Sequence, residues 1–242
     1  MKRERPIVLV IVEGSSDEAA LFDHLEAIVL VFDVRFEVLH GDVLTDMHNT
    51  NKTAKNIIGA IVADYKNKRK LGDDDILAVI QLTDTDGVFI PETSVLFDST
   101  LEKRLKYTCE EIIVSDKKRQ NLIIQRNGFK SKKLLALSRT KKINKAVFYI
   151  YYFSRNLDAI IHNNADLSDS EKITAAEEFS DSFANEIEFE QFFHNKDFAV
   201  VGDYQKSWNF ITQGCNSLNR YSNFHLLFAS LRSLFEEHRR SE

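Results

Sequence analysis

The sequence predicts an α/β protein with a central, mainly parallel sheet flanked by helices and followed by a mainly helical C-terminal region. Two continuous apolar runs, at residues 7–12 and 76–82, are typical of strands that are buried on both faces of a parallel sheet. Segments with helical periodicity alternate with these runs, and this βαβαβ order also favours a parallel sheet.

The first ninety residues supply the alternating elements. We expect strands at 7–12, 34–40 and 76–82 and helices at 19–32 and 53–66. Ser15 or Ser16 is the expected cap of the first helix, with acidic residues in its first turn. The second helix is amphipathic, with its isoleucines on one side and its lysines on the other.

The later segments are more varied. A short strand is predicted at 111–114, and the aromatic, β-branched run 146–153 predicts a fifth strand. Helices are predicted at 156–163, over most of 168–194 and at 222–238. We therefore expect a catalytic core at 1–153, including a basic insertion at about 115–145, and a helical lobe at 154–242.

Composition restricts the compartment and the partners. The chain has 242 residues, a net charge of −5 and two cysteines, whose spacing suits neither a metal site nor a disulfide framework. This cysteine usage predicts a reduced, cytoplasmic location. We expect no membrane partner, because no apolar run reaches bilayer length. A Gly-x-x-x-x-Gly-Lys phosphate loop is absent, so ATP hydrolysis by that route would need another chain.

Acidic residues follow two of the predicted strands. Glu13 ends the first strand, and Asp17 stands four residues on, at the start of a helix. Gly14 is expected to let the chain turn between them. Asp84 and Asp86 follow the third strand, where alternate side chains project the same way. Ligands bind beyond the carboxyl ends of parallel strands, and carboxylates suit Mg²⁺, so these residues predict a metal site.

These motifs resemble the Toprim domain of primases, topoisomerases and several nucleases. The resemblance covers roughly residues 6–115, and it implies a Rossmann-like Toprim core in which Glu13, Asp84 and Asp86 carry catalysis. The Glu13-x-x-x-Asp17 pair is similar to that of the overcoming-lysogenization-defect nucleases. That similarity implies two Mg²⁺ or Mn²⁺ ions, with Asp17 assisting. Asp17 stands where this family usually has Glu, so a direct ligand role is open.

The segment Ser154-Arg155-Asn156-Leu157-Asp158 follows the aromatic strand. It resembles an arginine-plus-acid helix start in Toprim-like proteins encoded beside ATPases in phage-defence loci. The resemblance implies that Asp158 completes a second metal site and that Arg155 clamps the scissile phosphate. The alternative is a capped helix with a surface ion pair. Lys206 is a further candidate, because the nuclease branch of the family uses a catalytic lysine.

A basic stretch at 117–145 contains eleven Lys or Arg residues and no acid. Cations beside acidic metal ligands suit a phosphodiester substrate. The stretch therefore predicts nucleic-acid contacts, against the alternative of a solvated charged face, and Phe129 would stack on a base or anchor the core. The candidate contacts are Lys117, Lys118, Arg119, Arg126, Lys130, Lys132, Lys133 and Arg139.

The combined expectation is a metal-dependent Toprim nuclease acting on DNA or RNA, tRNA included. By resemblance it would be the effector of an anti-phage or abortive-infection system paired with a separate ATPase, and a homo-oligomer is compatible with it. One alternative is a haloacid-dehalogenase-type phosphatase that uses Asp84 and Asp86, with Gly202-Asp203 as its late motif. Three features count against this phosphatase: two strands precede Asp84, Ser207 stands where its late motif has an acid, and Glu13 would have no role. A second alternative is a non-catalytic Toprim-like partner-binding subunit.

Overall fold

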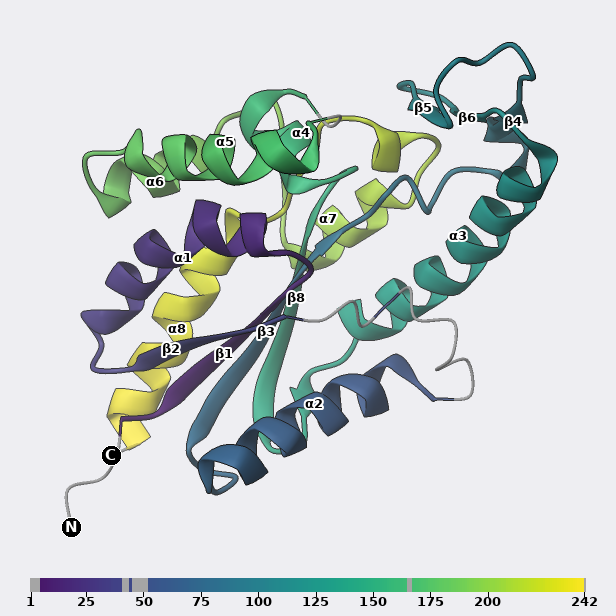
Figure 1. The fold of residues 1–242 in the computed structure, drawn as a ribbon. Coiled ribbons are helices and arrows are strands. Elements are labelled where there is room, and N and C mark those ends of the chain that lie inside the picture. Colours follow the sequence, from purple (N-terminus) through teal and green to yellow (C-terminus); the bar gives the residue numbers. More distant parts are fainter. Residues whose placement is uncertain (1–4, 41–43, 45–51, 165–166, 242) are drawn as a thin grey trace.

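The computed structural model describes residues 5–40, 44, 52–164 and 167–241, so residues 1–4 and 242, at the ends of the two expected regions, lie outside it. A five-stranded sheet has the order β2-β1-β3-β8-β7 (Figure 1). Its parallel strands are β1 (Ile7–Val12), β2 (Arg35–His40), β3 (Ile76–Asp84) and β8 (Ala146–Phe153). The edge strand β7 (Lys142–Ile143) is antiparallel to β8. The predicted α/β class with a mainly parallel sheet is confirmed.

The interior strand β1, between β2 and β3, shows why both faces of the sheet are covered. All six of its residues are buried. Because successive side chains of a strand point to opposite faces, Val8, Val10 and Val12 enter one core, while the intervening residues enter the other. A strand of this kind is stable only between two helical layers.

One helical layer packs on the face of Val8 and the other on the opposite face (Figure 1). The first contains α1 (Ser15–Leu30), α4 (Leu157–His162), α5 (Asp169–Asp181), α6 (Glu186–Phe193) and α8 (Leu226–Ser241). The second contains α2 (Ala54–Arg69), α3 (Lys117–Ser138) and α7 (Tyr204–Ile211). No helix in the described part of the chain is long and apolar enough to cross a bilayer.

The described residues of the expected C-terminal lobe, 154–164 and 167–241, are mainly helical and pack on both faces of the sheet. Phe228 of α8 lies in the same core as Val8, whereas Trp208 of α7 lies in the core of Leu9. These helices thus help to bury the strands. The boundary after residue 153 stays a prediction.

Three details differ from the sequence expectation. The first helix begins at Ser15 and its cap is Gly14, rather than Ser15 or Ser16. The predicted strand at 111–114 is β6 (Ile112–Val114), which belongs to a separate sheet with β4 (Val95–Phe97) and β5 (Leu105–Tyr107). The aromatic strand β8 is therefore the fourth parallel strand of the main sheet. Its pairing with β3 is a long-range contact that no local pattern specifies.

The basic stretch forms a helix of the second layer. α3 spans 22 residues and buries Leu134 and Leu137 in the same core as Leu9. The stretch therefore is not an insertion on the surface of the fold. Its many lysines obscured the apolar positions, which nevertheless recur at helical spacing.

Gly87 and Gly14 differ in their need for glycine. Gly87 has a φ of +69°, and a Cβ there would lie 2.4 Å from Cδ2 of Leu218 in the 3-10 helix η3 (Asn216–Leu218). Gly14 has a φ of −136°, which any residue adopts, and a Cβ there would meet Ser16 Oγ only at 3.7 Å. The expectation that Gly14 provides a turn special to glycine is wrong.

We expect Gly87→Ala to lower the free energy of unfolding by about 1–3 kcal/mol, because the left-handed backbone and the contact with Leu218 both oppose a side chain. Gly14→Ala is the matched control and should stay within about 0.5 kcal/mol of the original protein. Urea unfolding of the three proteins measures the difference. Equal stability of the two variants would contradict the stated role of Gly87.

Candidate functional site

The parallel strands end at one edge of the sheet, where acidic side chains from different strands meet. Glu13 follows β1 and Asp84 ends β3. The backbone N–H of Asp84 donates to Glu13 Oε1 at 3.2 Å, and the Thr83 hydroxyl donates to the same oxygen at 2.6 Å. The two predicted acidic motifs, seventy residues apart in the chain, are therefore in direct contact.

Asp17 joins this edge from the first turn of α1. Its Oδ2 accepts a hydrogen bond from the backbone N–H of Gly14 at 3.1 Å. Burial raises the pKa of Asp17 to about 6; the Gly14 hydrogen bond opposes that rise, while the nearby charges of Glu13 and Asp158 add to it. Asp17 thus lies within electrostatic reach of both neighbours.

Asp84 is the centre of the carboxylate group. Its Oδ1 accepts a hydrogen bond from the backbone N–H of Leu157 at the start of α4, at 3.1 Å. Burial raises the pKa of the Asp84 carboxyl well above its ordinary value, and the charges of Asp17, Glu13 and Asp86 raise it further. The sheet edge therefore concentrates more negative charge than its own groups neutralise. We call Glu13, Asp17, Asp84, Asp86 and Asp158 the carboxylate cluster.

Lys130 supplies a cation to this cluster. Its side chain is 0% exposed, and its Nζ lies 2.7 Å from Asp86 Oδ2 and 3.5 Å from Glu13 Oε1. Burial alone would lower the pKa of Lys130, but Asp86 and Glu13 more than offset it, so the pKa is above its ordinary value. Lys130 is predicted, with the other basic residues, to contact nucleic acid. The structure places its side chain inward from α3, against two carboxylates, and its contact with nucleic acid stays a prediction.

Asp86 and Arg155 lie on facing loops joined through their backbones. The N–H of Asp86 donates to the carbonyl of Arg155 at 3.0 Å, and both residues have left-handed φ angles of 49° and 60°. The Arg155 guanidinium lies over the Tyr107 ring, 5.3 Å from its centroid. Arg126 Nη2 donates to the carbonyl of Asp86 at 3.0 Å. Two guanidinium groups thus lie beside the carboxylate cluster, and the loop residues Asp86 and Arg155 are both held in a sparsely populated backbone conformation.

Asp158 lies in the first turn of α4, whose cap is Asn156. Its side chain is 8% exposed and lies 3.4 Å from the Lys172 ammonium of α5. The alternative of a capped helix with an ion pair is therefore present, but the ion pair is not at the surface. Asp158 therefore lies in the first turn of a capped helix, and its charge also acts on Asp17.

The loop that carries Asp84 and Asp86 is fastened to η3. The Thr85 hydroxyl donates to the carbonyl of Ser217 at 3.1 Å, and the N–H of Phe89 donates to the Ser217 hydroxyl at 3.2 Å. The N–H of Arg155 reaches the same carbonyl of Ser217 at 3.3 Å. η3 therefore positions both loops at the sheet edge.

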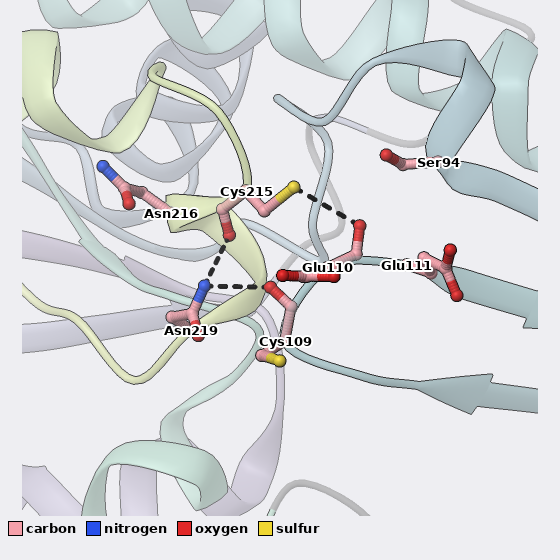
Figure 2. Close-up of a pocket in the computed structure, with 7 residues that line it drawn as sticks. All are labelled: Ser94, Cys109, Glu110, Glu111, Cys215, Asn216 and Asn219. Carbon is pink, nitrogen blue, oxygen red and sulfur yellow. Dashed lines mark hydrogen bonds between the residues drawn. The ribbon is translucent and has the colours of Figure 1, made fainter.

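η3 is in turn connected to the small sheet across a hollow of about 520 Å³ (Figure 2). The amide of Asn219 donates to the carbonyls of Cys109 and Cys215, and the Cys215 thiol points at the carbonyl of Glu110. Both cysteines are free thiols. These hydrogen bonds connect η3 and Asn219 to the turn between β5 and β6.

The structure does not bring Lys206 or Asp203 to the carboxylate cluster. Asp203 caps α7, and the exposed Lys206 ammonium lies 3.7 Å from it. Asp203 lines a different hollow with Arg139 and Tyr149. Lys130 and Lys172 contact the cluster, and the predicted Lys206 does not. Asp203 likewise lies near Tyr149, in the middle of β8, and not at the carboxyl end of the strands beside Asp84, where a phosphatase motif would require it.

The remaining basic residues surround the cluster at different depths. Lys117, Lys118 and Lys132 are exposed on α3, Arg119 is half-buried, and Arg139 at the end of the helix is exposed. Arg126 and Lys133 are half-buried, and Lys133 Nζ donates to the carbonyl of Leu44 at 3.0 Å. Their contact with nucleic acid stays a prediction.

The donors of the cluster fit a hard divalent cation in kind and charge. Among the described residues, no three His, Cys, Asp or Glu side chains are gathered tightly enough to hold a metal ion. The reason is visible in the contacts: Lys130 lies between Asp86 and Glu13, and backbone N–H groups hold Asp17 and Asp84. All five side chains nevertheless offer oxygen, the ligand atom that Mg²⁺ and Mn²⁺ prefer.

Sequence reasoning missed the roles of Lys130, Arg126, Thr83 and Lys172. A signal for Lys130 was present, because the buried positions of α3 recur at helical spacing through it. They are Ile123, Asn127, Lys130, Leu134 and Leu137. A lysine inside an apolar stripe predicts an inward-facing cation, and such a cation requires a buried acid. No comparable local signal marks Thr83 or Lys172.

Comparisons of the chain with models of known families, with curated proteins and with solved structures found no match.

We expect Asp84→Asn to stabilise the metal-free protein by about 1 kcal/mol, or about 2–4 °C in Tm, because the amide still accepts from Leu157 and removes one repelling charge. A carboxyl whose pKa is higher in the folded than in the unfolded chain stabilises the fold only while it is protonated. For the neighbouring Asp17, this contribution to the free energy of unfolding is complete below about pH 4 and is lost as the pH rises through about 6. Asp84, whose pKa is also raised, should follow the same direction. The gain should be larger at pH 8 than at pH 5, measured by thermal unfolding in EDTA.

Asp86→Asn is the control of opposite sign. It removes the closest partner of the buried Lys130 ammonium, so it should lower Tm under the same conditions. A lower Tm for Asp84→Asn at both pH values would refute the account of repulsion within the cluster.

Proposed function

We propose that this chain is a metal-dependent Toprim-type nuclease that hydrolyses phosphodiester bonds of DNA or RNA. The observation that carries the proposal is the contact between Glu13 and Asp84. Carboxylates from two parallel strands meet at the edge where such sheets bind ligands, and cations surround them. Negative ligands for a metal beside positive groups for a phosphate are what this chemistry requires.

The chain's own residues divide the work in this proposal. Arg155 and Arg126 bind the scissile phosphate beside Asp86, because guanidinium groups match phosphate oxygens. Lys130 pairs with Asp86 and Glu13 and so orients both carboxylates. Glu13, Asp84 and Asp86 are the principal metal ligands, and Asp17 and Asp158 are the further candidates for a second ion. Bound Mg²⁺ or Mn²⁺ supplies Lewis acidity toward the phosphodiester oxygens.

The cellular setting rests on the resemblance stated for the sequence motifs. We infer a cytoplasmic effector of an anti-phage or abortive-infection system, paired with a separate ATPase. That pairing agrees with the absence of a phosphate-loop motif from the chain. Fold-level analogy alone carries this part of the proposal.

Cleavage of labelled DNA, RNA and tRNA with Mn²⁺ or with EDTA tests the activity. The original protein should cleave at least one substrate with Mn²⁺ and none with EDTA. Glu13→Gln should reduce the rate at least about 100-fold, because it removes a metal ligand without changing shape. Glu26→Gln is the matched control, since Glu26 is exposed on α1 and outside the cluster, and it should cleave normally.

Equal cleavage by Glu13→Gln and the original protein would overturn the assignment. A small phosphomonoester separates the phosphatase alternative: turnover that is lost in Asp84→Asn but kept in Glu13→Gln would favour it. Metal binding without any cleavage would instead favour a non-catalytic, partner-binding subunit.

Mn²⁺ binding is a test that does not depend on activity. Titration calorimetry should detect Mn²⁺ binding to the original protein, with affinity reduced about 10- to 100-fold in Asp84→Asn and Glu13→Gln. Glu26→Gln should bind as the original protein does. If the original protein binds no Mn²⁺ at millimolar concentration, the metal-dependent mechanism fails.

A further inference from the structure

The outer side of α3 carries three parallel rows of side chains. Residues seven apart on a helix lie almost in line, because seven residues make nearly two turns. The inner row is Arg119, Arg126 and Lys133, the middle row is Leu122, Phe129 and Ala136, and the outer row is Lys118, Gln125 and Lys132. We call these nine residues the α3 strip. Basic rows therefore flank an apolar row.

The α3 strip borders the carboxylate cluster. Arg126 of its inner row donates to the carbonyl of Asp86, and Lys130, the next position inward on the helix, contacts Asp86 and Glu13. A linear ligand lying along the strip would therefore run past the candidate metal ligands.

Three cations of the strip have no acidic partner in the described part of the chain. In this they differ from exposed cations such as Lys68, which pairs with Asp64, and Arg232, which pairs with Glu190. Over the ranges that the structure describes, Lys118, Arg119 and Lys132 have no carboxylate within ion-pairing distance. No acid lies between residues 117 and 145. Cations left without acids are complementary to an anionic ligand.

The middle row adds an apolar component. Leu122 is 48% exposed and Phe129 is 45% exposed. Their row lies between the two basic rows. Phe129 therefore does not anchor the core. Phosphates need only the cations, whereas exposed apolar and aromatic side chains suit the faces of unstacked bases. A duplex hides those faces, and a single strand presents them together with its phosphates.

The depth of the cluster favours the same ligand. The side chains of Glu13 and Asp86 are only 21% and 30% exposed, and that of Asp158 is 8% exposed. A phosphate has to enter the sheet edge to reach them. A flexible single strand bends its backbone inward at one phosphate at little cost, whereas bending a stiff duplex costs deformation energy.

We propose that the α3 strip binds single-stranded nucleic acid, with phosphates on its basic rows and bases on Phe129 and Leu122, and directs it into the carboxylate cluster. The inference rests on the proposed nuclease function and specifies its substrate. The strip selects single strands by base contacts and is indifferent to sequence, because every base has an apolar face.

Fluorescence anisotropy in EDTA, where metal-dependent cleavage cannot proceed, tests the binding. Labelled single strands of DNA and RNA should bind at least about tenfold more tightly than the duplex of the same sequence. Phe129→Ala should weaken single-strand binding at least about fivefold, and Phe129→Trp should restore it. Ile187→Ala is the apolar control, because Ile187 is 69% exposed on α6 in the acidic region, and it should bind normally.

The charge contribution is read from the salt dependence. Lys118→Gln should make the slope of log affinity against log salt shallower by about 0.7, as expected for one lost phosphate contact on a single strand. Lys68→Gln, which removes an exposed lysine already paired with Asp64, should leave the slope unchanged. Circular dichroism verifies that each variant is folded.

Equal affinity for duplex and single strand, or no effect of Phe129→Ala, would overturn the proposal. Absence of oligonucleotide binding at low salt would also overturn it and would leave the strip as a protein-contact surface. The outcomes are separable from those of the nuclease assay. Single-strand binding without cleavage would retain the strip and reject the nuclease, whereas cleavage unaffected by Phe129→Ala would do the reverse.

Discussion

Repulsion among carboxylates at the end of the parallel sheet is the constraint that organises this molecule. Glu13, Asp84 and Asp86 leave strands β1 and β3 at one edge, where burial deprives them of water. Lys130, inserted from α3, is the cation that makes this arrangement compatible with folding. The position of α3 against the sheet is therefore an electrostatic requirement as well as a packing one.

The same constraint links the distant parts of the chain. α4 enters with a backbone N–H for Asp84, and α5 supplies Lys172 to Asp158. η3 holds the backbones of both edge loops through Ser217. Each of these elements belongs to the C-terminal half. That half therefore helps to determine the geometry of the site, although Glu13, Asp84 and Asp86 all come from the N-terminal half. This explains why residues 154–242 pack on the sheet instead of apart from it.

Charge is distributed so that attraction and repulsion lie side by side. The carboxylate cluster repels a phosphate unless cations intervene, and the guanidinium groups of Arg126 and Arg155 lie at its border. Farther out, Lys118, Arg119 and Lys132 of α3 have no carboxylate within ion-pairing distance among the residues that the structure describes. A nucleic-acid backbone is thus attracted along the helix and admitted to the acids only where positive groups accompany it. The net charge of −5 conceals this separation, because it is an average over the chain.

The sequence alone determined the strands and the acids. Runs such as Ile7–Val12 are apolar on every residue, so burial between two layers followed from local composition, and Glu13, Asp84 and Asp86 followed from the ends of such runs. The tertiary structure alone decided which strand lies beside which and which cation faces the acids. Lys130 is 117 residues from Glu13, and Ala146–Phe153 pairs with β3 across some seventy residues. Such long-range contacts depend on how whole elements pack together, and no local pattern encodes the resulting distance between two side chains.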